Sequence, residues 1–129
     1  MRVLADTHAW LWMLTDPDRL PARAAEVLAD PTTQVFVSAA SAWEIAIKYE
    51  LGRLPLPEPP TSFVPARLRA SGCDPLPIGH GHALAAGALP PHHRDPFDRL
   101  LIAQARQLRM PLCSGDGAVA DYDVEILWN

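Results

Sequence analysis

The sequence predicts an α/β fold of three layers, in which a mostly parallel sheet is covered by helices on both faces. Short β-branched or apolar runs alternate with longer segments of helical periodicity, in the order β-α-α-β-α-α-(β)-α-α-β-α-β. Such alternation is typical of parallel sheets, because parallel neighbours need crossover connections. The 129 residues are enough for one core, so we expect residues 1–129 to form a single domain.

The composition is that of an ordinary soluble domain, with 49% hydrophobic and 20% charged residues. No apolar run reaches the ~18 residues of a membrane span, and the apolar residues 9–14 do not resemble a signal peptide. Cys73 and Cys113 show no metal-binding or disulfide spacing, so we expect both to be reduced, in or near the core of a cytoplasmic protein. The net charge of −4 argues against a broadly basic nucleic-acid surface, but not against acids gathered in one metal-binding cleft.

The first half of the chain is predicted to contain two strands, each followed by helices. In chain order the predicted elements are a strand at 3–5, helices at 9–14 and 21–29, a strand at 34–38 and a helix at 39–51. Gly52 closes the last of these helices, because glycine readily adopts the left-handed conformation found at helix ends.

The second half begins with the proline-rich residues 53–60, which we interpret as a stiff connector within one domain. The predicted elements that follow are a helix capped by Thr61 or Ser62 and ending at Ala70 before Gly72, a strand at 76–78, helices at 80–88 and from 96, and strands at 110–114 and 124–128. The loop at 89–94 contains the His92-His93 pair. We expect this pair to be solvated, since adjacent side chains rarely converge on one metal.

The helix that begins after Asp95 carries an acid on its inward face. Asp95 suits the N-cap and Pro96 the first helical position, which places Asp98 in the first turn. At about 100° per residue, the apolar stripe that encloses Asp98 consists of Phe97, Leu101, Ile102, Ala105 and Leu108. An inward carboxylate must be paired or must coordinate a metal, although the helix dipole also favours an acid in the first turn.

Three further acids stand where ligand sites of α/β sheets form. Asp6 and Asp116 each follow a strand, and Glu44 lies on the apolar stripe of its helix. Each also has a structural interpretation: Asp6 could cap the next helix, Asp116 could belong to a turn between glycines, and Glu44 could form a capping box with Ser41 or pair with Lys48. In a parallel sheet all of these positions can meet at the carboxyl ends of the strands.

Four carboxylates at one place repel one another unless a cation lies between them. Oxygen ligands select hard cations such as Mg²⁺ or Mn²⁺. Such a centre is suited to phosphoryl chemistry, because the ions stabilise charge on the scissile phosphate and activate an attacking water.

Four stretches of the chain form a pattern: Asp6-Thr7, Ser41–Ala46 with Lys48, Asp95–Ala105 and Ser114–Asp116. In this order they resemble the PIN-domain ribonucleases, and among these the VapC toxins of bacterial toxin–antitoxin pairs. The resemblance covers the whole chain and implies a PIN-like fold. It further implies that the catalytic and metal-binding residues are Asp6, Glu44, Asp98 and Asp116.

The resemblance also implies a function. The expected enzyme is an endoribonuclease dependent on Mg²⁺ or Mn²⁺ that cleaves single-stranded RNA and leaves a 5′-phosphate and a 3′-hydroxyl. The expected partners are RNA, a cognate VapB-type antitoxin and a second copy in a homodimer. The chain departs from many family members at His8 and at Ser114-Gly115.

Residues beside the four acids are candidates for the second shell or for substrate contacts: Asp95, Ser114, Arg94 and Arg99. Asp95 could join the metal shell instead of only capping its helix, and Ser114 could donate to a ligand carboxylate or satisfy the backbone. Arg94 and Arg99 are candidate phosphate contacts, with the His92-His93 pair as a weaker candidate. The alternative for both arginines is a solvated helix face.

Trp10, Trp12 and Trp43 could form part of a groove for a partner helix or could belong to the core. A receiver-type signalling domain is disfavoured, since it needs a lysine after a late strand and Lys48 is the only lysine. Two alternatives stay open: a PIN-like domain that binds RNA or a protein without cleavage, and a nuclease that acts on DNA.

Overall fold

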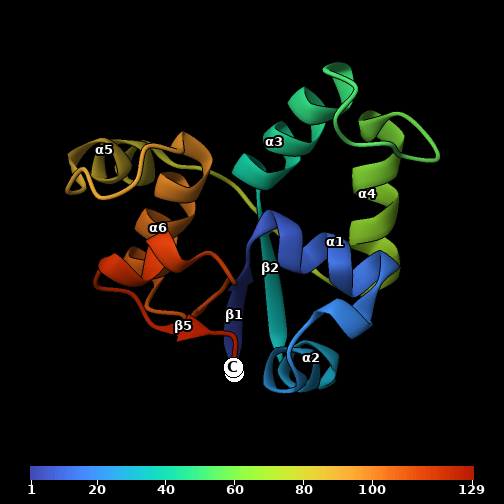
Figure 1. Cartoon of the computed structure of the whole chain (residues 1–129), viewed down its shortest axis with the longest axis horizontal. Coiled ribbons are helices and arrows are strands. Elements are labelled where there is room, and N and C mark those ends of the chain that lie inside the picture. The colour runs from blue at the N-terminus through green and yellow to red at the C-terminus, as the bar shows by residue number, and fades with distance from the viewer.

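A computed structural model describes residues 1–129 and contains one five-stranded sheet between two layers of helices (Figure 1). The strands are β1 (Arg2–Ala5), β2 (Gln34–Ser38), β3 (Asp74–Leu76), β4 (Leu112–Cys113) and β5 (Ile126–Leu127). Every pairing is parallel, and the order in the sheet is β3-β2-β1-β4-β5. The chain therefore starts in the middle of the sheet, and the strand order reverses between β1 and β4, where ligands of open α/β sheets commonly bind.

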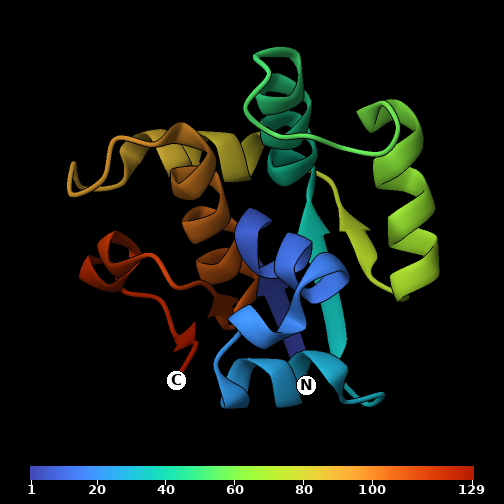
Figure 2. The same cartoon turned by 45° about the vertical axis from the view of Figure 1, so that its right-hand side comes forward.

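Six α-helices connect the strands. They are α1 (Thr7–Thr15), α2 (Ala22–Ala29), α3 (Ala39–Glu50), α4 (Pro60–Ser71), α5 (His80–Ala88) and α6 (Pro96–Leu108). A short 3₁₀ helix at Pro17–Arg19 was not predicted from the sequence, whereas a second one at Gly117–Asp121 lies between the last two strands, where the predicted order has a helix. Figure 2 shows both chain ends at the same side of the molecule, below the strands. None of the helices is both long and apolar enough to span a membrane.

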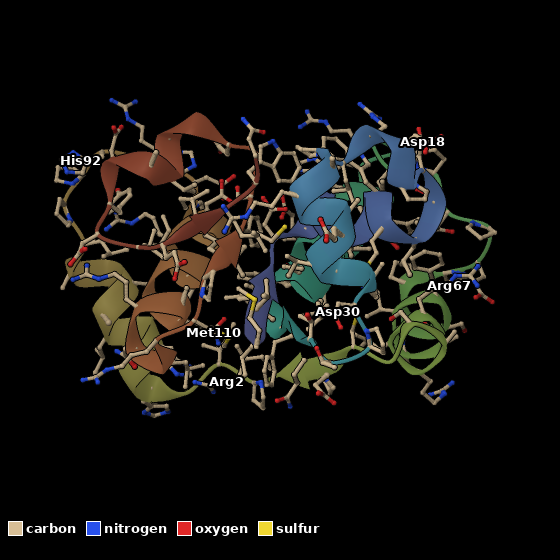
Figure 3. All side chains as sticks on the ribbon, turned by 90° about the horizontal axis from the view of Figure 1, so that it is seen from below. Arg2, Asp18, Asp30, Arg67, His92 and Met110 are labelled. Atoms are coloured by element: carbon tan, nitrogen blue, oxygen red, sulfur yellow. The ribbon has the colours of Figure 1, made fainter.

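Two buried clusters cover the two faces of the sheet, because side chains alternate along each strand. Val3 and Ala5 belong to a cluster that includes Trp10 of α1 and Phe63 of α4. Leu4, between them, belongs to the cluster formed with α6, which also contains the buried Met110. In the view from below, Met110 lies near the middle, whereas Asp18 and Arg67 lie toward the periphery (Figure 3). The predicted three-layer architecture is confirmed.

The predicted strand at 34–38 and the predicted helix at 80–88 agree with the structure residue for residue. Helix α4 differs, because it begins at Pro60 and Pro59 occupies the N-cap without any side-chain hydrogen bond. The predicted cap by Thr61 or Ser62 is therefore wrong, and the fixed φ of proline at the first position starts the helix instead.

Strand β3 lies two residues earlier than predicted, at 74–76. It is an edge strand that pairs only with β2, and the Gln34 amide of β2 donates to the Asp74 carboxylate at 3.0 Å. Strands β4 and β5 are shorter than predicted. Cys73 and Cys113 are free and buried, as expected.

Candidate metal centre

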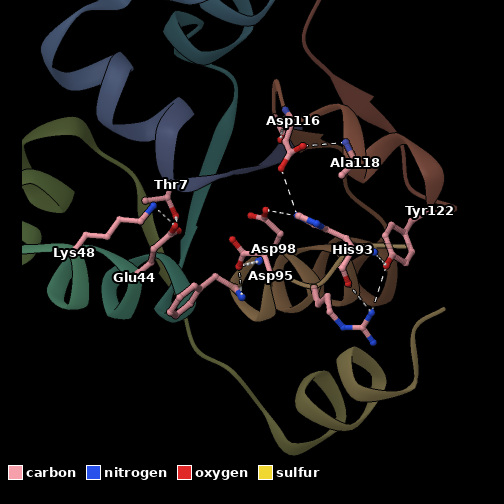
Figure 4. Close-up of polar contacts among 12 residues, drawn as sticks. Thr7, Glu44, Lys48, His93, Asp95, Asp98, Asp116, Ala118 and Tyr122 are labelled. Atoms are coloured by element: carbon pink, nitrogen blue, oxygen red, sulfur yellow. Dashed lines mark hydrogen bonds and ion pairs between the residues drawn. The ribbon is translucent and has the colours of Figure 1, made fainter. Parts of the chain in front are cut away.

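The candidate ligands gather above the carboxyl ends of β1 and β4. Asp6 directly follows β1, and Ser114 begins the turn after β4 that leads to Asp116. Asp98 comes from the first turn of α6 and Glu44 from the interior of α3. Figure 4 shows Asp98, Asp116 and His93 close together, with Glu44, Thr7 and Lys48 grouped beside them.

Asp6 both caps helix α1 and lines the candidate site. Its carboxylate accepts from the Ala9 N–H at 2.8 Å and so caps α1, and only 7% of the residue is exposed. Burial raises the pKa of Asp6, while the Ala9 N–H and the Ser114 hydroxyl oppose that rise. Asp6 also lines a cavity of about 340 Å³ together with Asp116. The capping interpretation is therefore correct and compatible with a place at the site.

Asp98 lies in the first turn of α6, as predicted. Asp95 caps this helix by accepting from the N–H groups of Phe97 at 2.8 Å and of Asp98 at 3.3 Å. Burial raises the pKa of Asp98 to about 6; the hydrogen bond with His93 opposes this rise, and the charges of Asp95 and Asp116 add to it. The site thus holds a carboxyl group that is costly to ionise without a nearby cation.

His93 contacts two of the acids, and the prediction of a solvated side chain is wrong for this residue. Its Nε2 lies 2.7 Å from Asp98 Oδ2 and 3.4 Å from Asp116 Oδ2. One ligand atom from each of the three residues lies within 4.8 Å of the others, a grouping that can hold a metal ion. The hydrogen bond to Asp98 raises the pKa of His93. The prediction holds for His92, which is exposed and packs edge-on against the Tyr122 ring.

Arg99 and Tyr122 hold the loop that carries His93. The Arg99 guanidinium donates at 2.9–3.2 Å to backbone carbonyl oxygens of residues 86, 89, 90 and 93. Tyr122 Oη accepts from the His93 N–H at 2.9 Å and donates to the Pro90 carbonyl at 2.7 Å. Arg99 is therefore neither a solvated residue nor a free phosphate contact, because the loop occupies its donors. Arg94 is exposed and makes no hydrogen bond or ion pair.

Glu44 is buried and is held from two sides. It forms a salt bridge of 2.7 Å with Lys48 and accepts from Thr7 Oγ1 at 2.6 Å. The predicted pairing with Lys48 is confirmed. The predicted capping box with Ser41 is wrong, because the Ser38 side chain caps α3 and Ser41 Oγ instead lies 2.9 Å from Thr7 Oγ1, within hydrogen-bond distance. Glu44 is thus paired with a lysine and is not one of the three residues whose ligand atoms lie within 4.8 Å of one another.

Asp116 lies in the turn after β4 and caps the following 3₁₀ helix through the Ala118 N–H at 2.9 Å. The Asp116 N–H in turn donates to Ser114 Oγ at 3.2 Å, and the same hydroxyl interacts with the Asp6 carboxylate, so Ser114 serves both the backbone and a candidate ligand. Gly115, between them, passes close to Trp128: a Cβ at Gly115 would lie 2.6 Å from the indole ring. Glycine at this position therefore lets the turn approach Trp128 while Asp116 lines the cavity.

The three tryptophans do not form one groove. Trp10 is fully buried in the core, which corrects the groove interpretation for this residue. Trp12 is partly buried beside Trp128, with ring centroids 6.0 Å apart. Trp43 is 59% exposed and contacts the Phe97 ring edge-on at 5.3 Å, so it lies beside the start of α6.

Comparison with known proteins places these features in context. The sequence profile of the PIN domain matches residues 3–125. Ribonuclease VapC16 of Mycobacterium tuberculosis is 47% identical over 73 residues, which are 51% of this chain and 52% of that protein. The chain thus spans about half the length of the curated relative that it matches.

Three solved structures have a similar fold. VapBC2 from Rickettsia felis, bound to a DNA fragment from its promoter, gives a TM-score of 0.71 at 14% identity over 100% of both chains. A toxin–antitoxin complex from Klebsiella pneumoniae gives 0.66 at 15% identity, over 97% of this chain and 95% of that one. FitAcB from Neisseria gonorrhoeae gives 0.61 at 18% identity, over 97% and 96%. At these identities the similarity concerns the fold.

Proposed function

Since this chain belongs to the PIN domain family, we propose that it is an endoribonuclease that hydrolyses RNA phosphodiester bonds with the help of a divalent metal ion. The observation that carries the proposal is the convergence of the Asp98 and Asp116 carboxylates, from α6 and from the turn after β4, at the carboxyl edge of the sheet. The name of the relative VapC16 supports it, since that protein is called a ribonuclease.

The residues fit a hard divalent cation, Mg²⁺ or Mn²⁺. The cluster offers carboxylate oxygens, which these ions prefer. The raised pKa values of Asp6 and Asp98 mean that their ionised forms are unfavourable without a cation. A bound cation would stabilise both ionised carboxylates. No arginine occupies the cluster, because Arg99 is turned toward the backbone of the preceding loop.

The proposed catalytic set is Asp6, Glu44, Asp98 and Asp116. When bound, the metal supplies positive charge for the scissile phosphate and lowers the pKa of an attacking water. The chain contributes orientation: the caps on Ala9 and Ala118 fix the carboxylates of Asp6 and Asp116. Arg94 is the exposed cation beside the acids and is the proposed contact for the RNA backbone.

The proposed partners are a VapB-type antitoxin and a second copy of the chain. One structural neighbour was solved as a toxin–antitoxin complex, and another is VapBC2 bound to a promoter DNA fragment. The exposed Trp43, next to Phe97 at the start of α6, is an apolar contact for a partner that covers the site. The exposed Leu84 on α5 offers a second apolar contact, suited to a homodimer. Sedimentation of the wild type beside Leu84→Asp tests the dimer, which the substitution should dissociate.

RNA cleavage tests the proposal directly. The metal-free chain is mixed with single-stranded RNA, duplex RNA or single-stranded DNA, with Mg²⁺, Mn²⁺ or EDTA. Asp6→Asn and Asp98→Asn should lose at least about a hundredfold in rate. Asp18→Asn is the matched control, because this acid is exposed, lies in the 3₁₀ helix after α1 and contacts none of the candidate ligands. Cleavage that survives EDTA would refute the metal, and cleavage of DNA alone would refute RNA as the substrate. A folded wild type that cleaves nothing would favour a domain that only binds.

A further inference from the structure

We infer that His93 supplies an imidazole nitrogen to the metal centre, so that the centre binds transition-metal ions in preference to Mg²⁺. The inference rests on the proposed function, because it takes Asp98 and Asp116 as ligands of the same ion. The inference adds a nitrogen ligand, from the loop before α6, to a set of candidate ligands that otherwise consists of carboxylates.

The distances suit a shared ion. His93 Nε2 is 2.7 Å from Asp98 Oδ2 and 3.4 Å from Asp116 Oδ2. Ligand atoms about 2.1 Å from an ion in octahedral geometry lie about 3.0 Å from their neighbours. Nε2 carries at most one hydrogen, so in the absence of an ion it can donate well to Asp98 only. An ion at the same place would satisfy both carboxylates and the imidazole.

The backbone of His93 is fixed on both sides. Its N–H donates to Tyr122 Oη at 2.9 Å, and its carbonyl accepts from Arg99 Nη1 at 3.2 Å. The side chain is only 19% exposed. A ring held in this way loses little conformational entropy when it binds an ion, which favours a ligand role. The adjacent His92 has no such contacts with the acids and lies at the outer edge of the molecule in Figure 3.

The chemistry of the donor predicts the selectivity. Mg²⁺ prefers oxygen ligands and gains little from imidazole, whereas affinity for nitrogen sites rises from Mn²⁺ through Co²⁺ to Ni²⁺. A centre with His93 should therefore bind Co²⁺ more tightly than Mg²⁺. The ratio of the two affinities should fall when His93 is replaced. His8 is the other imidazole near the acids, since it lines the cavity with Asp6 and Asp116. The experiment must separate His93 from His8.

Calorimetric titration of the metal-free chain with CoCl₂ and with MgCl₂ measures this ratio without RNA. His93→Gln should weaken Co²⁺ binding by at least about tenfold and change Mg²⁺ binding much less. His92→Gln is the matched control and should change neither affinity. Nitrogen modulation in the electron spin echo of bound Mn²⁺ should be present in the wild type and in His8→Gln, and absent in His93→Gln. Thermal unfolding in EDTA checks that each variant is folded, and His93→Asn repeats the test in a second variant.

Three results would overturn the inference while leaving the proposed function intact. Unchanged Co²⁺ affinity and nitrogen modulation in His93→Gln would exclude the ligand role, as would loss of the modulation in His8→Gln instead. Tighter metal binding by His93→Gln would mean that the histidine competes with the ion for Asp98. Failure of the proposed function looks different, since the wild type would then bind no ion or cleave no RNA, and a wild type that binds no ion overturns both.

Discussion

Replacing Arg99 with alanine should release the loop that carries His93 and destabilise the whole domain. The guanidinium donates to carbonyl oxygens of four residues between positions 86 and 93, at 2.9–3.2 Å. These carbonyls belong to the end of α5 and to the loop before α6, so a single side chain ties the two segments together. Arg94 provides a matched control, because it lies on the same loop, is exposed and makes no hydrogen bond or ion pair.

The magnitude follows from the number of hydrogen bonds. Each contributes about 1 kcal/mol after exchange with water, and the partly exposed site argues against the larger values for charged donors. The expected loss for Arg99→Ala is therefore about 4 kcal/mol, a large part of the roughly 5–15 kcal/mol that stabilises a typical domain. At about 3–4 °C per kcal/mol for a domain of this size, Tm should fall by roughly 12–16 °C. Arg94→Ala should change the free energy of unfolding by less than about 0.5 kcal/mol.

Thermal unfolding followed by circular dichroism in EDTA measures both variants, and limited proteolysis shows whether cleavage moves to residues 89–94. Arg99→Lys should recover less than half of the loss, since an ammonium group cannot reach carbonyls on several sides at once. Equal Tm values for Arg99→Ala and Arg94→Ala would refute the reasoning. In that case the observed hydrogen bonds would not hold the loop, and the fixed position of His93 would need another cause.

Other consequences concern the titratable groups. The folded-state pKa of Asp98, about 6, lies above its ordinary value of 3.8. As the pH rises between these values, Asp98 ionises in the metal-free unfolded chain before it does so in the folded one. The free energy of unfolding should therefore fall over this range. Asp98→Asn should reduce this slope in thermal unfolding from pH 4 to 7, and an unchanged slope would argue against the shift. Burial raises the pKa of Cys113 to about 12, so neither Cys113 nor the buried Cys73 should react with iodoacetamide in the native state. Mass spectrometry should find both alkylated only in denaturant. Lys48→Met should cost about 2 kcal/mol, because it leaves the buried Glu44 carboxylate without its cation. The double variant with Glu44→Gln should recover most of that loss in urea unfolding, and additive losses would contradict the pairing.

Local sequence signals were sufficient for the existence and order of the five strands and six α-helices, although not for the bounds of β3, β4 and β5, and they placed Asp6 and Asp116 after strands. Asp95 and Pro96 mark the start of α6 through rules that involve only neighbouring residues, and the structure has both at the expected positions. The acids that follow strands lie at the carboxyl edge because the sheet is parallel, which the alternation of elements already implied. Residue type and spacing therefore predicted that the candidate site lies at the carboxyl edge of the sheet.

Long-range contacts account for what the sequence did not reveal. The orientation of His93 depends on Tyr122, which lies between the last two predicted strands and far from His93 in the sequence, and on an arginine that periodicity places outside the apolar stripe. A charged residue off the stripe is expected to face solvent or substrate, and nothing in the local sequence shows that Arg99 instead bends toward the preceding loop. The available signal was weak: a histidine two residues before the Asp95 cap must lie near the N-terminus of α6.

The position of β1 in the middle of the sheet has a consequence for biosynthesis. β1 can pair with β2 as soon as the first third of the chain has left the ribosome, but its other edge is filled only by β4 at Leu112–Cys113. Asp6 and Asp116 lie at opposite ends of the chain and line one cavity only after that late pairing. A nascent chain therefore exposes an unpaired strand edge and has no complete acidic site until β4 and the turn to Asp116 have been synthesised. Translation that stops before β4 would yield a fragment prone to aggregation and without the proposed nuclease centre.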